Sequence, residues 1–445
     1  MSIINAASCS HTDINAAIAI AITGDTVKVP ACTFTLTGSV AVDKDLILEG
    51  AGKTLTILTC DVNNNHILLG NHNVKFRGFK LTASSCTGSN PFLLQVEGDN
   101  WRAHDNKFEC TQSGQFTNGV WVYGQTRGVH PTGLIDLNEF IDARILVYGP
   151  NTDEWTTDFV IGNPNQDKVV YSERNTFTFS TSGGTNYIDG ELGSQYVSRF
   201  NTIVNSGAEV HSMFGAPGGR NGRTWEIYKE SASSDNGFFA PAFIRGGTGV
   251  SWGNTYSGYS FNNSRLDNRR SFESPGGVDG PCDGDSAWDE NTPTENGHRC
   301  SDQIGTGNDS AGTFPQPQAH MPAYFWNNTN TPSVVNCGSA FKPNGSCDDI
   351  VSDRDYYVAT GVNDGSSGVG VGTSLPSTCT IGVGFWKTNE GSWNTLGGEQ
   401  GVLYKCTSTN VWTLYYTPYT YPHPLSLLDD FVPPSTKILM GQCLT

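Results

Sequence analysis

Carboxylate pairs recur at alternating positions in the middle of this chain. In the stretch Ile188-Asp-Gly-Glu-Leu192, an extended backbone places Ile188 and Leu192 on one face and Asp189 and Glu191 on the other. If the aliphatic face is buried, both carboxyls face outward. Two such groups can divide glycoside hydrolysis, one protonating the leaving oxygen while the other activates water or attacks directly. Adjacent like charges would raise the pKa of one carboxyl and so create the acid.

Two later stretches repeat the alternation. Glu209 and His211 face outward around an inward Val210, and Arg245 ends a similar stretch. The 20 residues from Glu191 to His211 fit one turn of a repeating β-structure, and the 34 from His211 to Arg245 fit two. We therefore expect one outward stripe made of Asp189, Glu191, Glu209, His211 and Arg245.

The same groups suit a second reaction, β-elimination at a uronic acid. There a base removes the proton beside the sugar carboxylate while a cation neutralises that carboxylate. His211 would be the base, and Arg220, Arg223 or Arg245 the cation. Arg220 and Arg223 belong to a glycine-rich turn over residues 215–223, which could lean over a groove and hold a hydroxyl or carboxylate.

The candidate residues thus fall into two sets. The direction of Glu226 stays open, because alignment on Trp225 and Ile227 sends it outward and alignment on the Asn repeats sends it inward. We expect catalysis from Asp189, Glu191 and His211, and substrate binding from Glu209, Arg220, Arg223, Glu226 and Arg245.

A recurring Asn-x-apolar tripeptide indicates that these stretches belong to repeating units that stack on one another. It occurs, at intervals of 26 to 53 residues and with a degenerate copy near Tyr228, at Asn106, Asn138, Asn175, Asn201 and Asn254. Units that cannot bury their own apolar face must stack on one another. Because the units are rich in β-formers and lack helical periodicity, we predict an all-β chain that forms a single-stranded parallel β-helix. The Asn would tolerate a left-handed turn and bond the turns above and below.

The beginning of the chain predicts a cap for this solenoid. Thr12 or Asp13 could cap a short helix, which would cover the open end of the stacked strands. Its apolar face would hold Ala16, Ala17, Ile20 and Ala21.

The phrases D-I-N-A-A-I, G-D-T-V-K-V-P-A and L-I-L-E-G-A-G lie in residues 13–52. They resemble the N-terminal cap and first coil of the pectate-lyase-like, right-handed parallel β-helix superfamily, and the resemblance extends over roughly residues 5–260. It implies the fold but no reaction, because this fold hosts lyases, hydrolases, esterases and adhesins. The polygalacturonase signatures and the pectate-lyase arginine pattern are absent. The opening is also similar to β-helix proteins of tailed phages, whose tailspikes share the superfamily.

The composition of the chain excludes some classes of binding partner. The net charge of −17 and the lack of a basic stripe argue against nucleic acid. No run approaches transmembrane length, so we expect no membrane insertion. Acidic residues Asp279, Asp283, Asp285 and Asp289 could form a calcium loop, although a solvated loop is favoured and no cofactor is otherwise expected.

The 12 cysteines indicate disulfides and an oxidising exterior. The local pairs are Cys9–Cys32, Cys60–Cys86, Cys282–Cys300, Cys337–Cys347 and Cys379–Cys406, with Cys110 and Cys443 left to pair or stay free. Because the chain opens without a basic and apolar leader, we expect either a removed signal or another exit route, such as a virion.

Four parts follow from these patterns: a cap and first strand (1–45), the β-helix (46–260), an Asp/Asn/Gly-rich, disulfide-tied region (261–350) and a β-rich C-terminal segment (351–445) that packs on or caps the solenoid. The aromatics of the last part are either core residues or a sugar-binding platform.

We therefore predict an extracellular or virion-associated protein that binds a polysaccharide and depolymerises it, with hydrolysis slightly favoured. A lyase is the first alternative, and a non-catalytic tailspike, fibre or adhesin the second. The sequence leaves both monomer and homotrimer open.

Overall fold

The structure is a computed structural model, and the residues that it describes are 1–60, 66–70, 72–83, 86, 92–112, 115–125, 130–150, 155, 161–162, 169–180, 185–212, 220–261, 263–267, 300, 302–309, 318–334 and 350–427. Several predictions fall elsewhere, namely the calcium loop of Asp279, Asp283, Asp285 and Asp289 and the pairings of Cys282, Cys337, Cys347 and Cys443.

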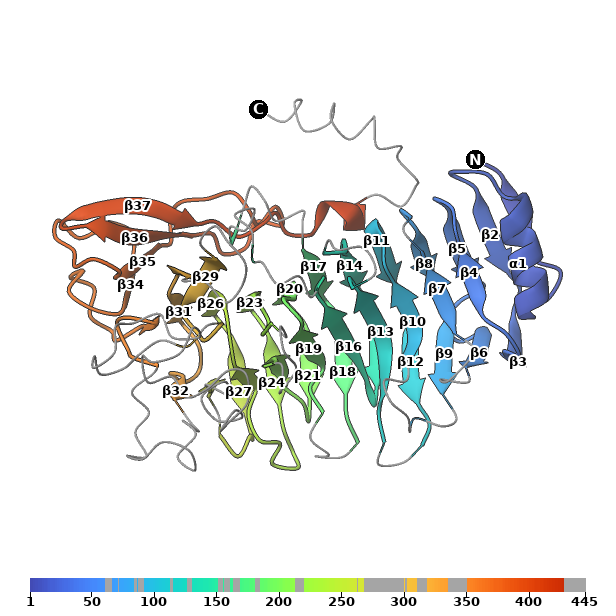
Figure 1. Cartoon of the computed structure of the whole chain (residues 1–445), viewed down its shortest axis with the longest axis horizontal. Helices are drawn as coiled ribbons and strands as arrows, with labels where there is room; N and C mark the ends of the chain where they lie inside the picture. The colour runs from blue at the N-terminus through green and yellow to red at the C-terminus, as the bar shows by residue number, and fades with distance from the viewer. Residues whose placement is uncertain are drawn as a thin grey trace.

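Within these residues, three long sheets are built from parallel pairs of strands (Figure 1). The twelve-stranded sheet contains, in spatial order, β1 (Ile3–Asn5), β2 (Thr26–Val29), β5 (Ile47–Gly50), β8 (Lys75–Arg77), β11 (Asp99–His104), β14 (Thr132–Asp136), β17 (Val170–Glu173), β20 (Gln195–Arg199), β23 (Thr224–Tyr228), β26 (Thr248–Trp252), β31 (Ala323–Trp326) and β33 (Tyr356–Val358).

The nine-stranded sheet contains β3 (Cys32–Thr35), β6 (Thr56–Cys60), β9 (Lys80–Ala83), β12 (Lys107–Cys110), β15 (Glu139–Ile141), β18 (Thr176–Thr178), β21 (Thr202–Val204), β24 (Ser231–Ser233) and β27 (Thr255–Ser257). The ten-stranded sheet contains β4 (Val40–Val42), β7 (Ile67–Leu69), β10 (Phe92–Val96), β13 (Thr117–Tyr123), β16 (Ala143–Tyr148), β19 (Ile188–Glu191), β22 (Ala208–Val210), β25 (Ala242–Ile244), β28 (Arg265–Leu266) and β32 (Ser333–Val334).

Consecutive strands visit the three sheets in turn, so that β11, β12 and β13 form one coil and β14, β15 and β16 the next. Each strand pairs with its counterparts in the neighbouring coils, which makes the fold a parallel β-helix. Inward side chains of the three sheets form one continuous core. Phe108, Phe140 and Phe177 stack inside it with ring centroids 4.9 and 4.5 Å apart.

The Asn repeats form a ladder at the turn between the twelve- and nine-stranded sheets. The backbone N–H and side-chain amide of Asn106 donate to Oδ1 of Asn138, at 3.0 and 3.1 Å. Asn138 bonds Asn175 in the same way, and Asn175 bonds Asn201. The stacking prediction is thus confirmed, and the ladder continues beyond the predicted repeats to Asn328, which accepts from Asn254.

Two details of the predicted ladder were wrong or incomplete. The left-handed residue is not the Asn but the one before it, for example Asp105 at φ 54° and Leu137 at φ 59°. The Asn is therefore selected for its amide rather than for its backbone. The degenerate copy near Tyr228 is Glu230, whose carboxylate accepts from both N–H groups of Asn201 and from Ser198 Oγ.

At the N-terminal end, α1 (His11–Ile20) begins after Ser10, whose Oγ accepts from Asp13 N at 3.1 Å. The predicted cap residues were therefore wrong. Ile14, Ala17 and Ile18 are buried against the first coils, whereas Ile20 is 73% exposed and Ala16 is also exposed.

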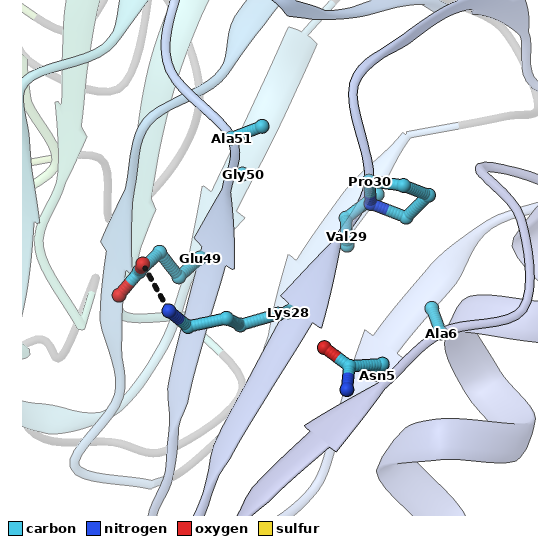
Figure 2. A pocket seen from close by; sticks show the side chains of 8 residues that line it. All are labelled: Asn5, Ala6, Lys28, Val29, Pro30, Glu49, Gly50 and Ala51. Carbon is cyan, nitrogen blue, oxygen red and sulfur yellow. Dashed lines mark ion pairs between the residues drawn. The ribbon is translucent and has the colours of Figure 1, made fainter.

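Near this end of the molecule lies a hollow of 340 Å³ (Figure 2). It is lined by residues of β1, β2 and β5 and by the turns that follow them. Its charged groups are Lys28 and Glu49, which form an ion pair at 3.4 Å.

Three disulfides lie in the described part of the chain. Cys9–Cys32 and Cys379–Cys406 confirm two predicted pairs. The pairing of Cys60 with Cys86 was wrong, as was the expectation that Cys110 pairs with Cys443 or stays free, because Cys86 bonds Cys110. Cys60 is a buried thiol, and burial raises its pKa to about 12.

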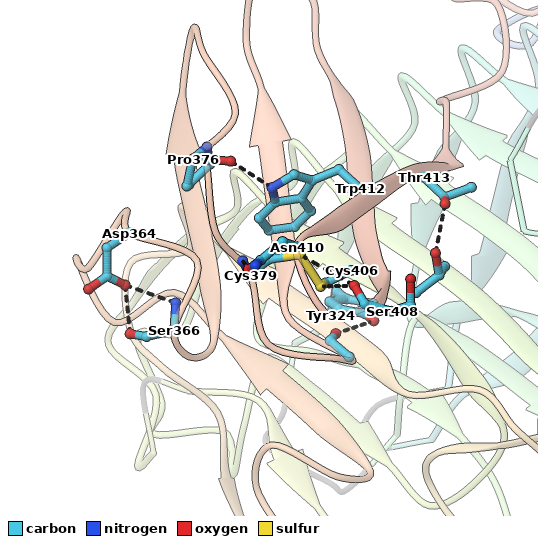
Figure 3. Close-up of a disulfide and its surroundings, with 12 residues drawn as sticks. Tyr324, Asp364, Ser366, Pro376, Cys379, Cys406, Ser408, Asn410, Trp412 and Thr413 are labelled. Carbon is cyan, nitrogen blue, oxygen red and sulfur yellow. Dashed lines mark hydrogen bonds between the residues drawn. A yellow bond between two sulfur atoms is a disulfide. The ribbon is translucent and has the colours of Figure 1, made fainter.

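The C-terminal part forms a separate four-stranded sheet of β34 (Val369–Gly372), β35 (Gly384–Lys387), β36 (Val402–Ser408) and β37 (Val411–Tyr416). Its disulfide Cys379–Cys406 lies beside Trp412, whose indole donates to the Pro376 carbonyl (Figure 3). Trp386 and Trp393 are buried against Trp252 and Trp326 on the outer face of the twelve-stranded sheet. Trp386 and Trp393 are therefore core residues, whereas Trp412 and Tyr415 are half-buried.

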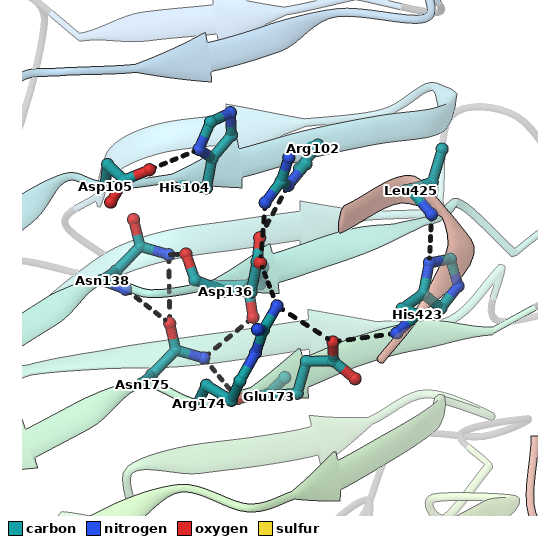
Figure 4. Close-up of polar contacts among 12 residues, drawn as sticks. Arg102, His104, Asp105, Asp136, Asn138, Glu173, Arg174, Asn175, His423 and Leu425 are labelled. Atoms are coloured by element: carbon teal, nitrogen blue, oxygen red, sulfur yellow. Dashed lines mark hydrogen bonds and ion pairs between the residues drawn. The ribbon is translucent and has the colours of Figure 1, made fainter. Parts of the chain in front are cut away.

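A strap from residue 417 to η2 (Pro424–Leu427) continues along the same face. Buried Arg199 donates to Glu173 and to the carbonyls of Tyr419 and Thr420, at 2.8 to 2.9 Å. The His423 N–H donates to Glu173 (Figure 4). The strap is therefore fastened to the coils by a buried ion pair.

The only antiparallel pair outside the C-terminal sheet, among described residues, is β29 (Thr306–Asp309) with β30 (Gln318–His320). No described helix is both long and apolar enough to cross a membrane.

Candidate functional site

The outer face of the ten-stranded sheet brings most of the sequence-predicted residues together. Asp189 on β19 pairs in register with Glu209 on β22. The backbone N–H of His211 donates to the Gly190 carbonyl, and that of Arg245 to the Val210 carbonyl. The five residues lie on three successive coils and point away from the core, and this direction is the one that the alternation predicts: Asp189, Glu191, Glu209, His211 and Arg245. The expected two turns between His211 and Arg245 were wrong, because β22 pairs directly with β25.

Each outward residue is positioned by an inward neighbour. Ile188, Val210 and Ile244 are fully or almost fully buried in the solenoid core. A shift of one residue would expose these side chains and bury the charged ones, so the apolar pattern fixes which groups face outward.

Two arginines pair with two of the carboxylates. Arg144 NH1 lies 2.8 Å from Asp189 Oδ2, and Arg245 NH1 lies 2.8 Å from Glu209 Oε1. Nε2 of His211 lies 3.7 Å from the same Glu209 oxygen. Three carboxyls, those of Asp189, Glu191 and Glu209, therefore share two guanidiniums. Asp267, 3.9 Å from Arg245, adds further negative charge at the end of this row.

This imbalance changes the protonation of the cluster. Burial, reinforced by the charge of Asp189, raises the pKa of Glu191 to about 7 and that of Glu209 to about 8. Arg144 and Arg245 oppose the rise without cancelling it. Burial lowers the pKa of His211, which favours its neutral imidazole. The cluster therefore holds a proton on a carboxyl near neutral pH, which is the requirement for a general acid.

Glu191 is the best placed of the three carboxyls to transfer that proton. Asp189 and Glu209 are only 4% and 6% exposed, whereas Glu191 is half-buried. The Tyr148 side chain hydrogen-bonds to Glu191, and the two residues are paired in register between β16 and β19.

The two turn arginines lie in a different environment. Arg220 is fully buried, forms ion pairs with Asp302 and Asp309, and lies over the Trp155 ring at 4.2 Å. Arg223 donates to Asn308 Oδ1. Both side chains thus hold the segment around β29 in position.

Glu226 lies on β23 of the twelve-stranded sheet and not on the face of the other candidates. It points out of the solenoid, as alignment on Trp225 and Ile227 predicts, since those two residues are in the core. The C-terminal sheet covers it, and Tyr416 Oη donates to its carboxylate at 2.7 Å.

Sequence reasoning missed Arg144 and a row of aromatic rings on the same face. Arg144 could have been found from the alternation of Ala143-Arg-Ile-Leu-Val-Tyr148, but it lies 45 residues before its partner Asp189. The rings come from the coils just before the carboxyls: Phe92 on β10, Trp121 and Tyr123 on β13, and Tyr148 on β16. We call these four residues the aromatic shelf.

Members of the shelf contact one another. Trp121 is 4.9 Å from Phe92, 4.7 Å from Tyr123 and 5.4 Å from Tyr148 between ring centroids, each pair edge to face. All four rings are half-buried, so part of each remains accessible.

On the other side of the carboxyls, guanidiniums lie over phenylalanine rings. Arg245 lies 4.1 Å from Phe243, and Arg265 lies 4.1 Å from both Phe239 and Phe261. The described residues contain no group of three or more His, Cys, Asp or Glu side chains arranged to hold a metal ion.

No protein-family model and no curated protein matches this chain. Among solved structures, a variant of the catalytic domain of a GH87 alpha-1,3-glucanase in complex with tetrasaccharides is 11% identical, over 75% of this chain and 63% of that chain. The chain thus spans less than two thirds of that domain. The TM-score is 0.24, a likeness too weak to carry an argument about the site.

Proposed function

We propose that this protein binds a polysaccharide across the outer face of the ten-stranded sheet and hydrolyses it. Glu191 protonates the leaving oxygen, and Asp189, which pairs with Arg144, activates water or attacks directly. Glu209, His211 and Arg245 bind the sugar next to the scissile bond. The observation that carries the proposal is the cluster of three carboxyls and two guanidiniums, which retains a proton near neutral pH.

Other features support the setting of this reaction. Neighbouring groups of differing protonation on one face match the acid and base that glycoside hydrolysis needs. The disulfides are compatible with an extracellular protein. We further propose that the β-helix is right-handed and pectate-lyase-like, with α1 covering its first coil. The four-part division at residues 45, 260 and 350 stays a proposal, as do virion association and the choice between monomer and trimer.

Elimination is the second candidate, and one observation favours it. His211 is neutral because burial lowers its pKa, and it lies beside Glu209 and Arg245. A neutral imidazole next to a guanidinium could remove a proton from a uronic acid. The excess of carboxyls argues against it, because they would repel an anionic sugar.

The test is incubation with a panel of neutral and anionic polysaccharides, with reducing ends and the ultraviolet absorbance of unsaturated sugars measured together. Reducing ends without absorbance are expected. Absorbance rising with them would replace hydrolysis by elimination. Binding without either signal would leave a non-catalytic adhesin or tailspike.

A double variant, Asp189→Asn with Glu191→Gln, should lose turnover and keep binding. The matched control is Glu139→Gln, which makes the same chemical change on the nine-stranded sheet, where the Glu139 side chain is 46% exposed. Full turnover by the double variant would overturn the assignment of the acid and base.

A further inference from the structure

We infer that the aromatic shelf of Phe92, Trp121, Tyr123 and Tyr148 is a binding site for uncharged sugar rings, and that the glycan runs across the coils, parallel to the solenoid axis. This inference rests on the proposed function for the position of the scissile bond. It adds the direction in which the glycan runs and the chemical class of the sugars that bind on the shelf side of the scissile bond.

The first argument is continuity. Tyr148 hydrogen-bonds to Glu191 and lies in register with it, and Trp121 lies in register with Leu146, the neighbour of Asp189. The shelf and the carboxyls are therefore parts of one surface. From β10 to β19 the sheet advances by three strand spacings of about 4.8 Å, roughly 14 Å in all, which gives room for a short run of sugar units.

The second argument is the chemistry of the surface. Flat rings with accessible faces stack on the apolar faces of sugars, and a Tyr hydroxyl or Trp N–H at the ring edge can bond sugar hydroxyls. Trp121 is half-buried, so part of its indole ring is accessible for such stacking, although its N–H is buried and has no hydrogen-bond partner among the described residues.

The third argument is charge. The described charged groups on this part of the sheet are Glu97 and Glu191, together with Arg144, which is already paired with Asp189. Burial lowers the pKa of His66, whose ring contacts Phe92 at 4.1 Å, so this imidazole is neutral as well. A uronate or sulfated sugar would meet the carboxyl groups of Glu97 and Glu191 here, and the described cation on this part of the sheet, Arg144, is already paired. Uncharged sugars therefore fit the shelf.

The experiment uses the full chain with Glu191→Gln as the background, so that bound glycan is not cleaved. Binding is measured by retardation in native gels that contain neutral polysaccharides such as β-glucan, α-glucan or mannan, or anionic ones such as polygalacturonate or alginate. Trp121→Ala and Tyr123→Ala should each weaken binding of a neutral polysaccharide by about tenfold. Trp412→Ala, at a half-buried Trp on the C-terminal sheet, is the matched control and should bind like the background.

The outcomes separate this inference from the proposed function. Unchanged binding by both shelf variants, while the wild type still cleaves the glycan, would overturn the shelf and leave the hydrolase intact. Loss of binding in the shelf variants with full turnover by Glu191→Gln would support the shelf and overturn the acid. Preference for anionic over neutral polysaccharides at the shelf, or no binding of any polysaccharide, would overturn the inference. Circular dichroism of each variant guards against loss of binding by unfolding.

Discussion

The outer faces of the twelve-stranded and ten-stranded sheets both carry carboxyls and arginines, but the two sets of charges have different roles. On the twelve-stranded sheet, the two carboxylates of Asp136 and Glu173 form ion pairs with three arginines, namely Arg102, Arg174 and Arg199. The C-terminal strap covers part of this group, since it bonds Arg199. On the second, the carboxyls outnumber the guanidiniums, and half-buried groups remain at the surface.

The difference teaches how to read buried charge in a solenoid. We call a network balanced when each of its carboxylates has a guanidinium partner. Such a network, when it also bonds backbone carbonyls, holds segments of the chain together. An unbalanced network on an accessible face keeps a proton and costs stability, a combination typical of functional sites.

The largest expected effect comes from Glu191→Gln in the unbalanced cluster. Turnover should fall by about 10²–10⁴-fold, because an amide cannot protonate the leaving oxygen. Stability should not fall, because the change removes the surplus carboxyl. Initial rates and urea denaturation measure the two effects, and a variant that is both active and less stable would reverse the comparison.

Next comes Arg199→Met in the balanced network. It leaves Glu173 buried without its main partner and releases the strap carbonyls, so we expect a loss of about 3–5 kcal/mol in the free energy of unfolding. Turnover per folded molecule should stay unchanged. The control is Lys53→Met, which also removes a cation, because the ion pair of Lys53 with Glu139 is partly exposed, with side chains 32% and 46% accessible.

A smaller effect, on the pH dependence of stability, is expected from Glu230→Asn. This variant tests whether a raised carboxyl pKa is by itself enough to identify a catalytic site. Burial raises the pKa of Glu230 to about 8, above its unfolded value, so the folded state binds the extra proton. Stability should therefore be highest below about pH 4.5 and fall as pH rises towards 8, by up to about 1.4 kcal/mol per pH unit.

The Asn variant restores the rung used elsewhere in the ladder, so its free energy of unfolding should lose this pH dependence. Turnover should not change, because Glu230 lies in the core. Denaturation at pH 5 and pH 8 gives the answer, and an unaltered pH dependence would show that other groups cause it.

The most subtle prediction concerns the pH dependence of turnover. Because the pKa of Glu191 is raised to about 7, the rate should fall about tenfold per pH unit above that value as the acid loses its proton. The control is Glu139→Gln, which should keep the same profile. A rate that rises below pH 6.5 and stays level above pH 7 would instead favour neutral His211 as a base, because burial lowers the pKa of His211 from its ordinary value of 6.5.

Local pattern was enough to predict the β-helix and the outward stripe. The spacing of Asn138 and the other Asn repeats indicates that the coils stack. The buried side chains of Ile188 and Val210 determine that the neighbouring side chains point outward. Contacts between distant segments were not predictable in this way. Glu226 gives no sign of Tyr416, 190 residues later, and Cys86 is nearly equidistant in sequence from Cys60 and Cys110.

Trp121 was missed for another reason. An aromatic residue in a strand is usually a core residue, and its exposure depends on which face the register turns outward.

The bond from Arg199 to the strap has a consequence for synthesis. The Tyr419 and Thr420 carbonyls lie 220 and 221 residues after Arg199, so the ribosome delivers them long after the coil of Arg199 can form. Until then, the Arg199 guanidinium lacks these two carbonyl partners, and the Tyr171 and Phe200 rings lack their contacts with His423 and Tyr421. Docking of the strap therefore follows the synthesis of the coils that it covers.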